Sequence, residues 1–184
     1  MTFLRGAQAE TVVAYRFREE VEAFALWREG AWWIGRTDAT AERTLALFHA
    51  LSAELPGTVS VSFTRVRDGA ESVGANIALS DVREGIARLR PALARTGGVV
   101  VTLWGDDRQL SLSAQLSVWL WSSTAAWRAA LLAQGLVDVS PSLLTDRRWA
   151  EAREELAGSR DLDLVLDAVT TRLGLAAPTR TQRD

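Results

Sequence analysis

The fold class is decided by one stretch, residues 99–121, which reads VVVTLWGDDRQLSLSAQLSVWLW. Residues 99–104 and 110–121 are rich in apolar and β-branched side chains, and Gly105-Asp106-Asp107 between them is typical of a tight turn. We therefore predict two antiparallel strands that form a hairpin around this turn.

Two tryptophans near the end of this stretch indicate how its second strand is used. Trp119 and Trp121 lie two residues apart, so on a strand they share one face. Val118 and Leu120 then lie on the opposite face, which makes both faces apolar. The pattern predicts either a strand that is covered on both sides or a strand whose tryptophan face meets a partner.

Strands and helices alternate through the rest of the first 140 residues. Further strands are predicted at residues 11–17, 22–28, 31–35, 58–66 and 73–79. Thr37 or Asp38, Ser80 and Ser123 are the expected helix caps, and Thr37, Ser80 and Ser123 follow one another at equal intervals of 43 residues. This order fits three strand-strand-helix units. We expect Pro91 to kink or shorten the second helix.

These elements predict an α+β fold with a mainly antiparallel sheet of about six or seven strands and helices on one face. After Pro141 the sequence favours helices at residues 146–157 and from Ser159 to Gly174. We expect residues 1–140 to form the sheet domain and residues 141–175 to form a C-terminal helical hairpin on the same core. The polar residues 176–184 are expected to be a frayed tail.

Composition excludes several kinds of site. The chain has 184 residues, 48% of them hydrophobic and 24% charged, as in a globular protein of one ordinary domain. It contains no cysteine and a single histidine, which rules out a disulfide, a thiolate zinc site, a thiol nucleophile and a multi-histidine metal centre. Its motifs indicate no cofactor.

Charge and hydropathy bear on the partners of the protein. The formal net charge is -2, whereas nucleic-acid-binding modules usually carry a strong positive excess, so we expect no nucleic-acid partner. No apolar run reaches the roughly 18 residues that span a bilayer, so we expect a cytoplasmic protein without a membrane partner.

Aromatic and basic residues are the types that anchor protein interfaces. All 21 basic residues are arginine, and the chain contains eight tryptophans. Trp32 and Trp33 are adjacent and therefore point to opposite faces of a strand. The predicted partner-binding residues are Trp32, Trp33, Trp104, Trp119 and Trp121.

Carboxylates and the single histidine are the remaining candidates for chemistry. Asp106 and Asp107 lie in the predicted turn, where aspartate is common because it bonds the local backbone. Asp163 and Asp167 are spaced i, i+4 on a predicted helix and could hold a metal, although the sequence shows no third ligand. His49 fits a structural role, with Glu42 seven residues before it on nearly the same side of a helix.

Two segments resemble a known family. They are Phe24-Ala25-Leu26-Trp27 with Ala31-Trp32-Trp33-Ile34-Gly35-Arg36 and the helix 41–48 after it, and the strand and turn at 99–105. An aromatic strand that ends in glycine and arginine before an Ala/Arg/Leu-rich helix is similar to the opening of bacterial immunity proteins from polymorphic toxin systems. The resemblance spans at most residues 24–121. It implies a small cytoplasmic α+β protein that binds and blocks one cognate toxin.

Our leading hypothesis is a non-enzymatic protein-binding module, in its most specific form an immunity protein that neutralises a bacterial toxin. One alternative is a carboxylate-dependent, metal-assisted hydrolase that uses Asp106, Asp107 or the Asp163/Asp167 pair. The other is a small-ligand binder or a homo-oligomeric scaffold, since a free strand edge also allows a homodimer.

Overall fold

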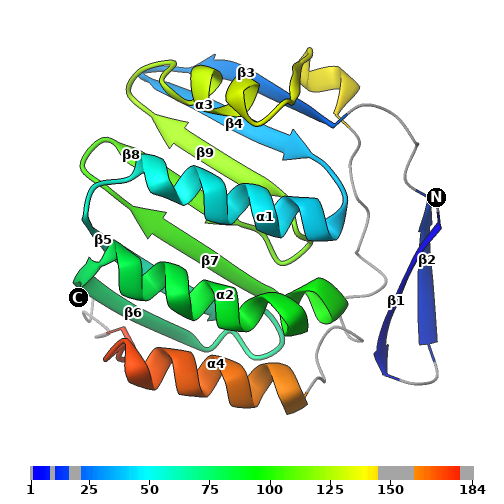
Figure 1. Cartoon of the computed structure of the whole chain (residues 1–184), viewed down its shortest axis with the longest axis vertical. Coiled ribbons are helices and arrows are strands. Elements are labelled where there is room, and N and C mark those ends of the chain that lie inside the picture. The colour runs from blue at the N-terminus through cyan, green and yellow to red at the C-terminus, as the bar shows by residue number, and fades with distance from the viewer. Residues whose placement is uncertain (1, 9–10, 17–21, 145–159, 179–184) are drawn as a thin grey trace, which may run out of the picture.

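Eight strands form one sheet in the order β10-β3-β4-β9-β8-β7-β5-β6 (Figure 1). The computed structural model describes residues 2–8, 11–16, 22–144 and 160–178. All neighbouring strands are antiparallel except β10 and β3. The strands are β3 (Ala23–Glu29), β4 (Trp32–Asp38), β5 (Thr58–Arg65), β6 (Glu71–Ala78), β7 (Val99–Trp104), β8 (Arg108–Leu112), β9 (Val118–Ser122) and β10 (Val137–Asp138).

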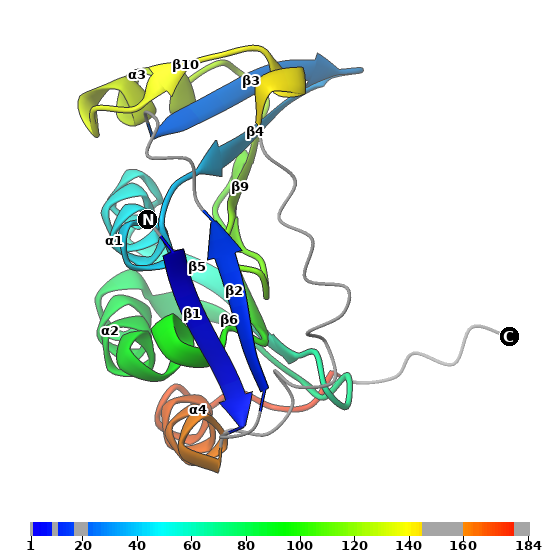
Figure 2. The same ribbon diagram turned by 90° about the vertical axis from the view of Figure 1, so that its right-hand side faces the viewer.

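The four described α-helices pack on one face of this sheet, as the side view in Figure 2 shows. The helices are α1 (Ala41–Leu51), α2 (Leu79–Thr96), α3 (Trp127–Ala133) and α4 (Arg160–Arg172), with short 3-10 turns η1 (Ser52–Glu54) and η2 (Pro141–Leu143). Their apolar stripes join the alternate side chains of the strands in one core. The predicted α+β class, with a mainly antiparallel sheet and helices on one face, is confirmed.

The deciding stretch contains one more turn than the sequence predicts. The hairpin of β7 and β8 turns at Gly105-Asp106-Asp107, as expected. Residues 110–121, however, form two antiparallel strands, β8 and β9, and not one. Between them the Ser113 hydroxyl accepts from the Ser117 amide at 3.0 Å, and Leu116 takes a left-handed backbone conformation with φ 58°. This tight reversal brings β9 beside β4.

None of the three predicted helix caps is used. β4 runs as far as Asp38, so α1 begins later, and the Thr40 hydroxyl accepts from the Arg43 amide. α2 follows β6 directly, and the amide of its first residue, Leu79, donates to the Gly57 carbonyl. α3 begins after Ala126 without a side-chain cap. The observed helix starts are unequally spaced and the third unit has three strands, so the equal intervals in the sequence do not mark three equal units.

Pro91 does not shorten α2, which continues to Thr96. The side chain lies on the exposed side of the helix, while the opposite stripe of Val82, Ile86, Leu89 and Leu93 is buried. The packing of this stripe outweighs the one backbone hydrogen bond that proline cannot donate.

Both ends of the chain differ from expectation. β2 (Thr11–Arg16) pairs with β1 (Thr2–Gln8) in a separate two-stranded hairpin and not with the main sheet. Ala176 is not part of a frayed tail, because its amide and carbonyl pair with Val73 on the edge strand β6. α4 and Gly174 match the last predicted helix. The predicted helix 146–157 lies outside the described residues, as does 179–184.

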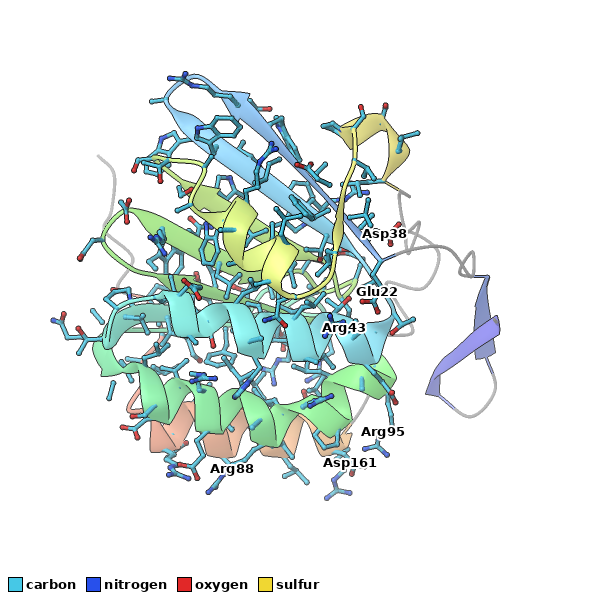
Figure 3. All side chains as sticks on the ribbon, turned by 45° about the horizontal axis from the view of Figure 1, so that its top comes forward. Glu22, Asp38, Arg43, Arg88, Arg95 and Asp161 are labelled. Atoms are coloured by element: carbon cyan, nitrogen blue, oxygen red, sulfur yellow. The ribbon has the colours of Figure 1, made fainter. Side chains whose placement is uncertain are left out.

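Ion pairs tie the helical layer together. Figure 3 shows Arg95 of α2 near Asp161 of α4, and these side chains approach to 3.7 Å. The Arg172 guanidinium of α4 reaches the Glu84 carboxylate of α2 at 2.6 Å. These contacts are exposed and screened by water, so each contributes little, and the apolar core supplies most of the stability. No helix in the described part of the chain has the length and apolar character needed to cross a membrane.

Gly35 lets two neighbouring strands pack under the helices. A Cβ atom at this position would lie 2.7 Å from Leu26 Cδ2 and 3.0 Å from Leu120 Cδ1, both in the core. We expect Gly35→Ala to lower the free energy of unfolding by about 1–3 kcal/mol, because both leucines must shift. Chemical denaturation measures the effect. Gly57→Ala is the control, since a Cβ there meets nothing within 4 Å; equal stability of the two variants would contradict the prediction.

Candidate functional site

Strand register decides which side chains gather on the sheet face opposite the helices. Residues that lie directly opposite in neighbouring strands point to the same face. Leu120 pairs with Gly35 and belongs to the helix-covered core, so its neighbours Trp119 and Trp121 point to the other face. Following the pairs across the sheet adds more side chains to that face, namely Trp27, Ile34, Arg36, Gln109, Trp104, Ser111 and Thr102.

Aromatic contacts connect three of the tryptophans on this face. The rings of Trp27 and Trp119 meet edge to face, with centroids 6.2 Å apart. Trp119 and Trp121 lie nearly parallel, with centroids 6.0 Å apart. The Arg36 guanidinium lies 5.6 Å from the Trp119 ring centroid. Each aromatic pair adds about 0.5–1.5 kcal/mol beyond the burial of its area, so the rings hold one another in place.

Two further tryptophans extend this cluster toward the end of the sheet and are more exposed. Trp32 is 49% exposed and Trp104 is 38% exposed. We call the set of Trp27, Trp32, Trp104, Trp119 and Trp121 the tryptophan face. Exposed tryptophans in a group are unusual on a protein surface and typically mark a contact with another molecule.

The structure brings together four of the five predicted partner-binding residues. Trp33 is the exception, because it pairs with Ser122 on the helix-covered side and packs against the core. Trp27 was not predicted. Its place follows from its pairing with Ile34, which depends on the register of β3 and β4. This register is set by the tight turn at Gly30 between the two strands. The glycine is visible in the sequence and is the signal that could have identified Trp27.

A chain of hydrogen bonds orients Trp104. Its indole Nε1–H donates to Gln109 Oε1 at 3.0 Å, and Gln109 Nε2 donates to the Ser111 hydroxyl at 3.3 Å. The Ser111 hydroxyl then donates to Thr102 Oγ1 at 2.9 Å. The exposed ring therefore has a defined position on the sheet and need not be ordered when a partner binds.

A pocket of about 210 Å³ opens where the β7–β8 turn meets the beginning of β4. We call it the turn pocket. Its lining consists of Trp32, Trp104, Gly105, Asp106, Asp107, Arg108, Gln109 and Trp121. It therefore combines three indole side chains of the tryptophan face with the two adjacent carboxylates of the turn.

The three charged side chains of the turn pocket differ in their bonding partners. The Ser123 hydroxyl donates to the Asp107 carboxylate at 3.0 Å, so the serine predicted as a helix cap instead fastens the turn. Arg108 donates to the Glu54 carbonyl at 3.1 Å and lies 5.8 Å from the Trp127 ring centroid, toward the helical layer, while its Nε lies 3.9 Å from Asp107 Oδ1. Asp106 is exposed, and no hydrogen bond or ion pair engages its carboxylate within residues 22–144 and 160–178.

The Asp163/Asp167 pair is not arranged as a metal site. Asp163 accepts from Arg65 at 3.2 Å and forms an ion pair with Arg67 at 2.9 Å. Two guanidinium groups thus already neutralise this carboxylate, while Asp167 is exposed on α4. In the described ranges, no three histidine or acidic side chains come close enough together to hold a metal ion.

His49 lies between α1 and α2. Its Nδ1 is 3.4 Å from the Arg83 guanidinium, so the residue that it meets is Arg83 and not the predicted Glu42. Burial, followed by the positive charges of Arg83 and Arg90, holds the pKa of His49 below its ordinary value of 6.5. As the pH falls, the His49 imidazole is therefore protonated at a higher pH in the unfolded chain than in the folded protein. The contribution of His49 to stability is complete above pH 6.5 and declines as the pH falls from there toward the lowered pKa.

The single histidine makes this shift measurable by ¹H NMR, since one Hε1 signal reports the titration. We expect a midpoint below pH 6.5, which Arg83→Gln raises without reaching 6.5, because burial is the larger cause. Arg88→Gln is the control, since Arg88 contacts Glu84 and not His49. A midpoint that Arg83→Gln leaves unchanged would show that this guanidinium does not act on the imidazole.

In comparisons with known proteins, no family model, no curated protein and no solved structure matches the chain.

Proposed function

We propose that this protein is a non-enzymatic protein-binding module that docks a protein partner on the tryptophan face. The observation that carries the proposal is the gathering of five tryptophans, from β3, β4, β7 and β9, on the sheet face opposite the described helices. Tryptophan is enriched at the energetic centres of protein interfaces because its large ring removes much apolar area from water.

The ordering of the rings supports the same reading. Ring contacts and the hydrogen bond from Trp104 to Gln109 fix the side chains before a partner arrives. A preorganised surface loses little conformational entropy on binding, so more of the contact energy remains as affinity. Together with the segments that resemble immunity proteins, this supports the more specific proposal of a module that neutralises a bacterial toxin in the cytoplasm.

The test begins with capture of partners from a lysate of the source organism and their identification by mass spectrometry. The captured protein is then purified and titrated calorimetrically against the wild type and against Trp119→Ala/Trp121→Ala, whose fold is checked by circular dichroism. We expect a one-to-one complex and a dissociation constant that rises at least about 30-fold in the double variant, because the loss of even one central tryptophan costs about 2 kcal/mol or more.

The matched control removes two exposed apolar side chains from the helical layer. Leu132 of α3 is 51% exposed and Leu164 of α4 is 61% exposed. Leu132→Ala/Leu164→Ala should bind as the wild type does. Equal weakening by both double variants would contradict docking on the tryptophan face. A homodimer that only the tryptophan variant dissociates would assign the face to self-association instead.

Toxin neutralisation has a separate readout. When the captured protein is produced alone in a bacterial host, growth should stop, and co-production of the wild type should restore it. Trp119→Ala/Trp121→Ala should not restore growth at equal expression. If the captured partner is not toxic, the proposal of a binding module stands and the proposal of an immunity function is wrong.

The metal-assisted hydrolase makes a different prediction for thermal stability. A divalent cation that binds only the folded state raises the melting temperature. Because Arg65 and Arg67 already occupy the Asp163 carboxylate, we expect millimolar Mg²⁺ or Mn²⁺ to leave the melting temperature unchanged. Scanning calorimetry tests this expectation. A rise that Asp163→Asn abolishes would favour the hydrolase.

A further inference from the structure

The turn pocket has a different chemical character from the rest of the tryptophan face. Elsewhere the face presents rings beside the neutral side chains of Ile34, Ser111 and Thr102, the positive charge of Arg36, and the Glu29 carboxylate, which accepts from the Trp27 indole Nε1–H at 3.4 Å. In the turn pocket, three tryptophans adjoin the carboxylates of Asp106 and Asp107. The one cation of its lining, Arg108, donates to the Glu54 carbonyl at 3.1 Å, and its Nε lies 3.9 Å from the Asp107 carboxylate. With two carboxylates and one guanidinium in its lining, the pocket is aromatic and has a net negative charge.

This combination attracts organic cations. An indole ring carries negative charge density on its face, and carboxylates add a full negative charge nearby. The same face already holds one such contact, in which the Arg36 guanidinium lies 5.6 Å from the centre of the Trp119 ring. The tryptophan face can thus accommodate a guanidinium beside an indole without further rearrangement.

The carboxylates favour a guanidinium over an ammonium. A guanidinium is planar, stacks on aromatic rings and donates two parallel hydrogen bonds to one carboxylate. Ser123 engages one oxygen of Asp107, whereas Asp106 is exposed in the lining beside Trp32 and Trp104. Asp106 is therefore the acceptor available to a guanidinium that enters between these rings.

We propose that the turn pocket is the receptor for an arginine side chain of the docked protein, with the guanidinium among Trp32, Trp104 and Trp121 and hydrogen-bonded to Asp106. This inference rests on the proposed function, because it names the chemistry of the group that the partner contributes. The proposal predicts that the partner carries an arginine where it contacts the β7–β8 turn.

The first experiment needs no partner. The full chain, labelled with ¹⁵N, is titrated with N-acetylarginine methylamide while the indole N–H signals of the tryptophans are followed by NMR. Trp→Phe variants assign the signals of Trp32, Trp104 and Trp121. We expect saturable shifts at these three indoles with a millimolar dissociation constant. The neutral citrulline derivative, which has nearly the same shape, should bind about tenfold more weakly or not at all.

Two aspartate variants and a lysine derivative test which groups of the pocket and of the probe are needed for binding. Asp106→Asn should weaken binding of the arginine derivative several-fold, while Asp167→Asn, which removes the same charge from exposed α4, should not change it. The lysine derivative should bind more weakly than the arginine derivative. Absence of saturable shifts, equal binding of citrulline, or tighter binding of lysine would each overturn the proposal.

The partner identified by capture separates this inference from the proposed function. We expect its affinity to fall about tenfold in Asp106→Asn and to stay unchanged in Asp167→Asn. A partner that depends on Trp119 and Trp121 but not on Asp106 would leave the docking face intact and overturn the arginine pocket. If no partner depends on Trp119 and Trp121, the proposed function itself fails, whatever the small probe does.

Discussion

The pairing of β4 with β9 is the constraint on which the rest of the structure depends. In this register Gly35 lies opposite Leu120, and the absence of a side chain at Gly35 leaves room for Leu26 and Leu120 in the core. A shift by one residue would exchange the faces of the whole strand, placing Trp119 and Trp121 under the helices and leucine in their place outside. The core and the tryptophan face are therefore two results of one register.

The two faces use tryptophan in different ways. Trp127 of α3 is fully buried, and its Nε1–H donates to the Trp121 carbonyl, so it joins the helical layer to β9. Trp32 and Trp104, in contrast, keep much of their ring area in water. That exposure gives up stability that burial would provide, about 25 cal/mol per Å² of apolar area. A docking function recovers this free energy when the partner covers the rings.

The aspartates show that residue type alone does not determine which carboxylate is available to a ligand. Of the four aspartates that could support chemistry, Asp163 is neutralised by Arg65 and Arg67, and Asp107 accepts from Ser123. Asp106 lines the turn pocket together with Asp107, but no hydrogen bond or ion pair engages its carboxylate within residues 22–144 and 160–178. Local preference explains all of these residues, Asp106 and Asp107 by their turn and Asp163 by its place in the first turn of α4, and only their contacts in the folded chain distinguish them.

The sequence by itself determined the α+β class, the alternation that separates Trp119 and Trp121 from Leu120, and the hairpin at Gly105, because these depend on neighbours within a few residues. The tertiary structure decided the second turn before β9, the starts of α1, α2 and α3, the packing of Trp33 against the core and the addition of Trp27 to the tryptophan face. Strand order and register join residues far apart in the chain, and one-dimensional periodicity contains no information about which strands become neighbours.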